Sequence, residues 1–233
     1  MSTLSELRTR ARQKVDAVNS LFFSDSEVSG YVNTGLGELY DILVLKYEDY
    51  FVSSLTFNLA SGTSNYTFSS IGLNNFYKLL GMDATQGGDT VKVRRSQFSD
   101  RNRYLSSEVV HNVRGHALYE YGIRGNSFEF TPDPTSTDEI KVWYIPKFQK
   151  LENDSDQVND NIMSNWEEYA ILVAAIKMRQ KEETATSSLE NELQRVTQLI
   201  ENAASNRDAN EPFGIVDENV GITPSHFSGS GWR

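Results

Sequence analysis

The chain has 233 residues, of which 38% are hydrophobic, and a formal net charge of −10 from 32 acidic and 22 basic residues. This length can bury a core in one large or two small domains, and the acidic balance argues against a protein that grips nucleic acid over its whole surface. The lack of cysteine excludes disulfides and thiolate metal sites, and the lack of any apolar run near ~20 residues predicts a soluble protein with no membrane partner.

Two helices are predicted in residues 1–50. In the first, apolar residues recur every three or four places: Leu4, Leu7, Ala11, Val15, Val18 and Phe22. A second apolar stripe follows between Val28 and Leu43. Each begins with a capping box, a hydroxyl residue followed three places later by glutamate: Thr3 with Glu6, and Ser24 with Glu27. Three glycines in the second helix each cost it roughly 1 kcal/mol, which predicts close packing there: Gly30, Gly35 and Gly37.

Residues 51–150 have a different pattern. Apolar and polar residues alternate in SLTFNL, TVKV, ALYEYGI and IKVWYI, which are rich in β-branched and aromatic residues. Arg124-Gly125-Asn126 separates two alternating runs and predicts a hairpin. We therefore expect a small, mostly antiparallel β-domain here, followed by a polar hinge, ENDSDQVNDN.

Two further helices are predicted in residues 161–206, with capping boxes formed by Ser164 with Glu167 and by Ser187 with Glu190. Short helices are marginal alone, so their apolar stripes must pack on one another. The predicted fold is α+β: a helical bundle made from the N- and C-terminal segments, an inserted antiparallel β-domain, and an extended C-terminal arm over residues 207–233.

This arm contains many helix and strand breakers, yet it also carries large apolar groups. Disordered tails usually lack aromatic residues, and burying one large apolar side chain is worth roughly 1.5–3 kcal/mol. We therefore expect the arm to dock on a partner or a neighbouring copy, although a mobile end is the alternative. The candidate docking residues are Phe213, Ile215, Val216, Phe227, Trp232 and Arg233.

No catalytic signature appears, so we predict that the chain is not an enzyme and has no cofactor. Glu108, His111 and His116 lie close in sequence but match no metalloenzyme spacing, which favours surface histidines. A calcium loop opened by Asp154, Asp156 and Asp160 would lack its central glycine and its final glutamate, which favours a solvated linker.

The strongest basic patch surrounds Phe98 and consists of Arg94, Arg95, Arg101 and Arg103. Basic residues beside an aromatic can bind nucleic acid, but a strand loop paired with an acidic surface explains the pattern as well. The first helix has its own basic residues, Arg8, Arg10, Arg12 and Lys14. They flank its apolar stripe and suit contact with another subunit or a solvated surface.

Several segments together resemble the head-to-tail adaptor (connector) proteins of tailed bacteriophages. They are SDSEVSGYVNTGLGELYDILV, YTFSSIGLNNFYKLLGMD, FTPDPTSTDEIKVWYIPKFQKL, NWEEYAILVAAIKMRQKEE and NRDANEPFGIVDE. The second segment departs from the expected pattern because no proline follows its tyrosine strand.

The resemblance implies a virion structural protein of the neck, assembled in the host cytoplasm. Such adaptors form a dodecameric ring that joins the portal protein to the next tail component (nozzle, stopper or tail tube). Double-stranded DNA passes through the ring without specific binding. On this interpretation the C-terminal candidates dock on the portal or a neighbour, and the basic patch contacts the tail side. A tail-associated receptor- or glycan-binding module is the alternative, and an enzyme with an unrecognised site is a third possibility.

Overall fold

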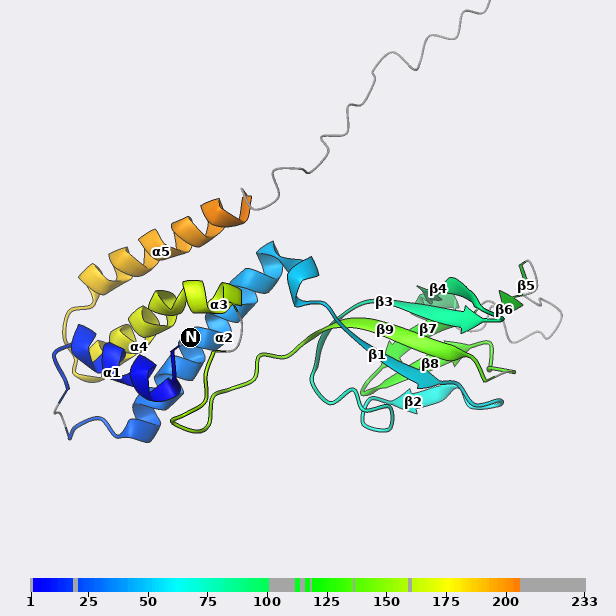
Figure 1. Ribbon diagram of the computed structural model, residues 1–233, viewed down its shortest axis with the longest axis horizontal. Coiled ribbons are helices and arrows are strands. Elements are labelled where there is room, and N and C mark those ends of the chain that lie inside the picture. The colour runs from blue at the N-terminus through cyan, green and yellow to red at the C-terminus, as the bar shows by residue number, and fades with distance from the viewer. Residues whose placement is uncertain are drawn as a thin grey trace, which may run out of the picture.

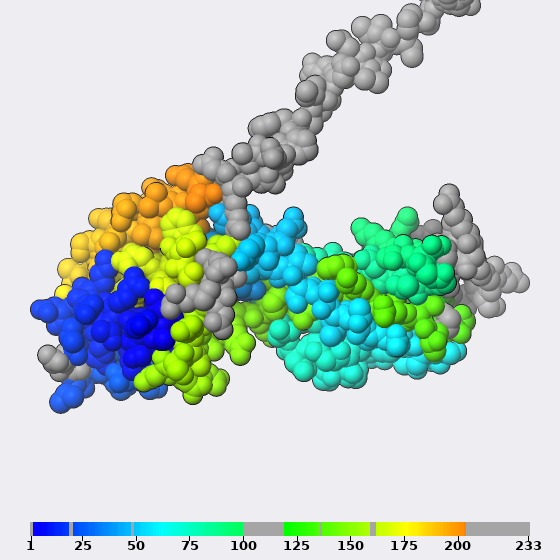
Figure 2. Space-filling view, viewed as in Figure 1, coloured from blue at the N-terminus to red at the C-terminus, as the bar shows by residue number. Residues whose placement is uncertain are grey.

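The computed structural model describes residues 2–18, 21–100, 112–113, 116–117, 119–135, 137–158 and 161–205. The described chain is mixed α and β, as predicted, with helices at one end and a curled sheet at the other (Figure 1). Figure 2 shows the two parts as two masses that meet at a narrower waist. The predicted C-terminal arm lies outside the described residues.

The helical part is formed by both ends of the chain. It consists of α1 (Leu4–Lys14), α2 (Asp25–Lys46), the short η1 (Glu48–Phe51), α3 (Asn161–Asn165), α4 (Glu167–Lys181) and α5 (Ser187–Ser205). Most residues of α4 are buried, because α1, α2 and α5 all contact it. This explains why α4 is apolar on all sides over residues 169–176, whereas α5 buries only one stripe that includes Val196 and Ile200.

One of the four predicted capping boxes is complete and a second is half formed. Thr3 and Glu6 form the complete box. The Ser24 hydroxyl accepts a hydrogen bond from the Glu27 N–H at 3.2 Å, but the Glu27 carboxylate binds Tyr31 and Lys181. The box predicted at Ser164 is wrong, because the Glu167 carboxylate instead binds Ser2 and Arg10. The box predicted at Ser187 is also wrong. The Thr186 hydroxyl donates to the Glu190 carboxylate at 2.7 Å, and Ser187 is already the first residue of the helix.

The first helix is shorter than its apolar stripe predicts. α1 ends at Lys14, and Asp16 takes a left-handed conformation with φ 59°. The buried Arg12 guanidinium donates to the Phe23 carbonyl at 2.8 Å, which holds the turn in place. As a result Val18 and Phe22, predicted to be part of the stripe, lie in the connection to α2 and are exposed.

The β part is one curled, seven-stranded sheet with the order β1-β9-β3-β4-β7-β8-β2. Its strands are β1 (Ser53–Asn58), β2 (Asn65–Thr67), β3 (Phe76–Gln86), β4 (Asp89–Arg95), β7 (Glu120–Arg124), β8 (Ser127–Thr131) and β9 (Glu139–Pro146). A short 3-10 turn, η2 (Phe98–Asp100), follows β4, and β5 (Asn112–Val113) pairs with β6 (His116–Ala117) apart from the sheet.

The sheet is mostly antiparallel, as predicted, and contains one parallel pair. β4 and β7 are parallel, with Arg94 opposite Glu120 and Arg95 opposite Tyr121. Residues 96–119 connect these strands, and a long crossover is what a parallel pair requires. The hairpin predicted at Gly125 is confirmed: it joins β7 to β8, and Gly125 takes the φ of 57° that its turn position favours.

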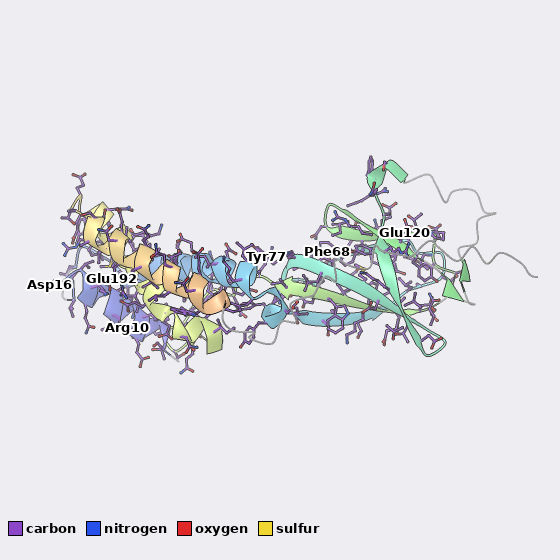
Figure 3. All side chains as sticks on the ribbon, turned by 90° about the horizontal axis from the view of Figure 1, so that it is seen from above. Arg10, Asp16, Phe68, Tyr77, Glu120 and Glu192 are labelled. Carbon is purple, nitrogen blue, oxygen red and sulfur yellow. The ribbon has the colours of Figure 1, made fainter. Side chains whose placement is uncertain are left out.

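The two parts have separate cores that meet through an aromatic junction. The helical core and the sheet core, half of whose buried residues are aromatic, contain different residues. At the junction the Tyr40 ring lies 5.0 Å from that of Phe51 and 5.9 Å from that of Phe148. Tyr77, at the start of β3, lies between the two parts (Figure 3), and its hydroxyl donates to Asp41 of α2 at 3.0 Å.

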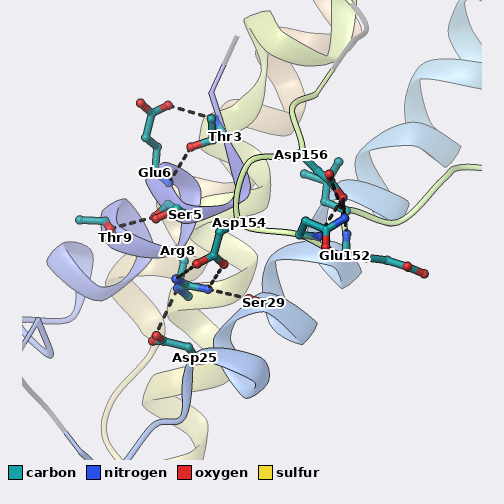
Figure 4. A network of polar contacts seen from close by, with 12 residues as sticks. Thr3, Ser5, Glu6, Arg8, Thr9, Asp25, Ser29, Glu152, Asp154 and Asp156 are labelled. Carbon is teal, nitrogen blue, oxygen red and sulfur yellow. Dashed lines mark hydrogen bonds and ion pairs between the residues drawn. The ribbon is translucent and has the colours of Figure 1, made fainter.

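The polar hinge forms a strap that is exposed to solvent over residues 152–155, as predicted, and that is held in place by hydrogen bonds and an ion pair. The Asp156 carboxylate accepts hydrogen bonds from the N–H groups of Glu152 and Asn153, both at 2.8 Å (Figure 4). The Asp154 carboxylate pairs with Arg8, and the strap carbonyls accept the first N–H groups of α1. These carboxylates therefore fix the chain's return to the helices; Asp160, the third residue of the calcium hypothesis, lies outside the described residues.

Candidate interaction surfaces

The basic residues of α1, for which the sequence allowed a subunit contact or a solvated surface, pair with acidic residues of the same chain. Arg10 pairs with Glu167 and Glu168, Lys14 with Glu168 and Glu192, and Arg8 with Asp154 and Asp25. The Arg8 guanidinium holds the pKa of Asp154 below its ordinary value. α1 is thereby fastened to the strap, to α4 and to α5.

The predicted tail-side contact is a patch at the end of β4. Arg94 and Arg95 are both exposed there, and Phe98 follows with 69% of its surface exposed. The structure adds Arg124 to this basic patch: its guanidinium carbon lies 5.5 Å from the Phe98 ring centroid, and it also pairs with Glu129 at 2.7 Å. Sequence spacing could not reveal Arg124, because it enters from β7. Arg101 and Arg103, the other predicted members, lie outside the described residues.

Exposed apolar side chains form a first candidate surface, the loop patch, between α1 and α2. It comprises Val18, Leu21 and Phe22, and Leu21 is fully exposed at 101%. The Lys181 ammonium lies 4.6 Å from the Phe22 ring centroid and pairs with Glu27 at 2.7 Å. A shallow hollow of about 610 Å³ adjoins Val18 and Leu21. Leu21 is outside the predicted apolar stripe, so sequence reasoning missed it.

A second candidate surface, the shoulder patch, lies at the other end of α2. It comprises Leu45, which is 81% exposed, and Tyr50 of η1, with the exposed acidic residues Asp41 and Asp49 beside them. The Tyr50 ring packs edge-on against the Phe51 ring, with 5.2 Å between the ring centroids. This contact holds the Tyr50 ring in place. Leu45 lies two residues beyond Leu43, where the predicted apolar stripe of α2 ends. Its exposure could therefore be found only from the structure.

The outer face of the sheet has one partly exposed tryptophan. Trp143 donates from its ring nitrogen to Asp83 at 2.6 Å, and the Lys141 ammonium lies 4.0 Å from its ring centroid. Its cross-strand neighbours are Ser54 and Gly81, and a Cβ on Gly81 would meet nothing within 4 Å. An aromatic ring with adjacent polar groups can stack on a ligand ring.

The waist between the two parts has an open groove of about 730 Å³. Buried aromatic residues and the polar strap line it, including Tyr40, Phe51, Phe148, Lys150 and Asp156. Among the described residues no three His, Asp or Glu side chains are grouped as a metal site requires. Within the same residues, no helix is both long and apolar enough to span a membrane.

Several predicted site residues cannot be located. The six C-terminal candidates are outside the described residues, namely Phe213, Ile215, Val216, Phe227, Trp232 and Arg233. Their docking role stays a prediction. His111 and Glu108 are outside them as well, and His116 is described only as part of β6. Comparison with protein-family models and with curated proteins gave no match for the chain.

Proposed function

We propose that the chain is a head-to-tail adaptor of a tailed bacteriophage, a structural protein of the virion neck that acts by ring assembly and not by catalysis. The observation that carries the proposal is the pair of exposed apolar surfaces, the loop patch and the shoulder patch, at opposite ends of α2. Each subunit of a ring has a neighbour on both sides and therefore needs two different contact surfaces. Exposed apolar groups that gather in patches mark such contacts.

The distribution of charge supports passage of DNA through the ring. Residues 1–51 and 147–205, which hold the helical part, contain 19 acidic residues against 11 basic ones, while residues 52–146 contain nine of each. An acidic or neutral channel wall lets a DNA duplex slide. Such a wall has no row of cations that could displace the counterions of the DNA and so bind the duplex. The proposed lumen is therefore lined mainly by the helical part.

The other partners are assigned to separate surfaces. The C-terminal residues, with Trp232 as the aromatic anchor and Arg233 as the charged one, dock on the portal protein. The basic patch, which carries the exposed Arg94 and Arg95, faces the downstream tail component. Twelve copies per ring follow from the resemblance to adaptors.

The test is to add the purified chain to portal-containing heads and to image the particles. Density for a ring of this fold directly below the portal supports the proposal. A matched variant, Arg94→Glu with Arg95→Glu, should join the portal normally and fail to recruit the tail component. A chain found on tail fibres, or one that never binds portal-containing heads, would overturn the adaptor assignment.

The outer face of the sheet favours one alternative, a glycan-binding module of the tail. A partly exposed Trp143 beside Asp83 and Lys141 could stack on a sugar ring and hydrogen-bond its hydroxyls. A glycan array separates the two functions. Binding that Trp143→Ala abolishes would favour the module, whereas no binding together with incorporation into heads favours the adaptor.

A further inference from the structure

We infer that residues 211–218 of this chain, EPFGIVDE, dock in the open groove at its waist, with the Phe213 side chain against the apolar floor of the groove. An apolar floor, a wall with unpaired backbone groups and the place where α5 ends all point to this occupant. The docking does not depend on the proposed function. It also leaves Trp232 and Arg233, which are assigned to the portal protein, outside the groove.

The floor of the groove is apolar and largely aromatic. Tyr40, Phe51 and Met163 are buried side chains that line it, and Phe148 is half-buried at its edge. The Tyr40 ring contacts the rings of both Phe51 and Phe148, and such a cluster packs favourably against one more aromatic ring. The volume of about 730 Å³ is that of an ordinary ligand pocket, about 300–1,000 Å³. A space of this size and lining suits a phenylalanine side chain.

One wall of the groove is a stretch of backbone that is only partly hydrogen-bonded. It follows β9 and forms no helix, strand or turn. The Lys147 N–H donates to the Asn75 carbonyl at 2.6 Å, and the Leu151 N–H donates to the Asn33 side chain at 2.8 Å. Between them, the N–H groups of residues 148–150 form no hydrogen bond with any described residue. A row of free backbone groups is a template on which an extended segment can pair.

The end of α5 places the segment within reach of the groove. α5 ends on the side of the helical part that faces the waist (Figure 1). There the Glu201 carboxylate pairs with Lys46 of α2 at 3.9 Å, and Phe51 of the groove floor follows Lys46 by five positions. Phe213 is eight residues beyond Ser205, the last residue of α5, and eight extended residues span up to about 26–29 Å. A short tether also holds the effective concentration of the segment in the millimolar range, so a weak contact is enough.

The charges favour this segment over the residues that follow it. Lys147 and Lys150 are exposed at the groove and form no ion pair with any described residue. The segment has one acidic residue before its apolar ones and two after them, whereas residues 219–233 have none and end in an arginine. The acidic residues that line the groove, Glu152 and Asp156, belong to the strap, where the Asp156 carboxylate accepts backbone N–H groups. Both lysines are therefore available to the segment.

Hydrogen exchange followed by mass spectrometry on the full native chain tests the contact at the backbone. Docking should protect the N–H groups of residues 148–150, which would exchange quickly in an empty groove. Phe213→Ala should raise their exchange rate about tenfold or more, because it removes the apolar anchor, whereas the matched control Trp232→Ala should leave the rate unchanged. Fast exchange in the native chain, protection that persists in Phe213→Ala, or an equal effect of Trp232→Ala would overturn the inference.

Disulfide trapping tests the position and the partner, since the native chain has no cysteine. Gly214→Cys with Gln149→Cys in one chain should form an intramolecular disulfide under mild oxidation. The matched control pairs Gly214→Cys with Asn58→Cys and should stay reduced, because Asn58 is exposed at the end of β1 farther from η1. Equal cross-linking of the two pairs would refute the site.

A mixture of Gly214→Cys chains and Gln149→Cys chains separates docking within one chain from docking between copies. The mixture should give no cross-linked dimer. A linked dimer would show that the segment of a neighbouring copy fills the groove, and it would overturn docking within one chain. All these measurements use the isolated chain, so their outcome is separate from binding to portal-containing heads.

Discussion

Replacing Gly35 by alanine should destabilise the protein, although alanine is the better helix former. Gly35 lies where α2 crosses α4, and a Cβ built there would be 2.7 Å from the Ala170 Cα and 2.8 Å from the Ala170 carbonyl oxygen. Real Cβ atoms essentially never approach a heavy atom closer than 3.0 Å. Both contacts are backbone atoms, so no side-chain rotation can relieve them, and the helices must move apart.

Two opposing terms set the size of the effect. Gly→Ala in a helix interior gains about 1 kcal/mol of stability, and overpacking a core costs about 1–3 kcal/mol or more. Because the added Cβ meets backbone atoms, we take the upper end of that cost and expect Gly35→Ala to lose about 2 kcal/mol net. Gly30, on the exposed side of the same helix, has nothing within 4 Å of its Cβ position. Gly30→Ala should therefore gain about 1 kcal/mol.

Urea unfolding followed by circular dichroism measures both variants against the native chain. The two midpoints should move in opposite directions, with Gly30→Ala above the native value and Gly35→Ala below it. A Gly35→Ala chain as stable as the native one, with Gly30→Ala stabilised as expected, would show that α2 and α4 are less closely packed than the structure has them. The sequence predicted close packing at all three glycines of α2; it is confirmed at Gly35 and wrong at Gly30.

Three other substitutions have defined outcomes. Arg12→Met should cost about 2–4 kcal/mol in urea unfolding, because it removes the donor to the buried Phe23 carbonyl; a loss below 0.5 kcal/mol, roughly that of an ordinary surface change, would contradict this. The Lys181 ammonium lowers the pKa of Glu27, so this carboxylate stabilises the fold at neutral pH and ceases to do so as pH falls below about 4. Glu27→Gln should thus lower stability at pH 7 and flatten its decline in acid, and an unchanged acid profile would refute the pairing. Truncation after Asn210 should abolish binding to portal-containing heads, whereas normal incorporation would remove the docking role of the C-terminus.

The sequence predicts best what depends on local periodicity. The helices at both ends of the chain, the alternating strands and the turn at Gly125 all follow from spacing and turn chemistry over a few residues. Two of the predictions that failed depend on a partner outside the helix concerned. Glu167 does not cap α4 because its carboxylate binds Ser2, 165 positions earlier. α1 stops at Lys14, ahead of the end of its apolar stripe, because Arg12 reaches the Phe23 carbonyl.

The state of the surface residues was predicted less well, for a related physical reason. A charge run in the sequence does not show whether its members find partners within the chain. The basic residues of α1 do, through acidic residues more than 140 positions away such as Asp154 and Glu167. The exposed Leu21 and Leu45 belong to no periodic pattern, so only the packing of the helices identifies them as surface groups.

The junction between the two parts determines whether contacts at one end can position the other. Tyr40 belongs to the helical core, yet its hydroxyl donates to the Pro146 carbonyl at the end of β9, at 2.7 Å. Ile145 of β9 is buried in that same helical core, and Tyr77 of β3 bonds Asp41 of α2. The residues at the waist are thus packed and hydrogen-bonded to one another. A free linker, in contrast, would let the two parts move independently. In the proposed ring, copies joined through the ends of α2 would therefore hold their β parts at fixed angles. A tail component could then contact all the basic patches of the ring at once. Many weak contacts made together would bind it much more tightly than any one of them alone.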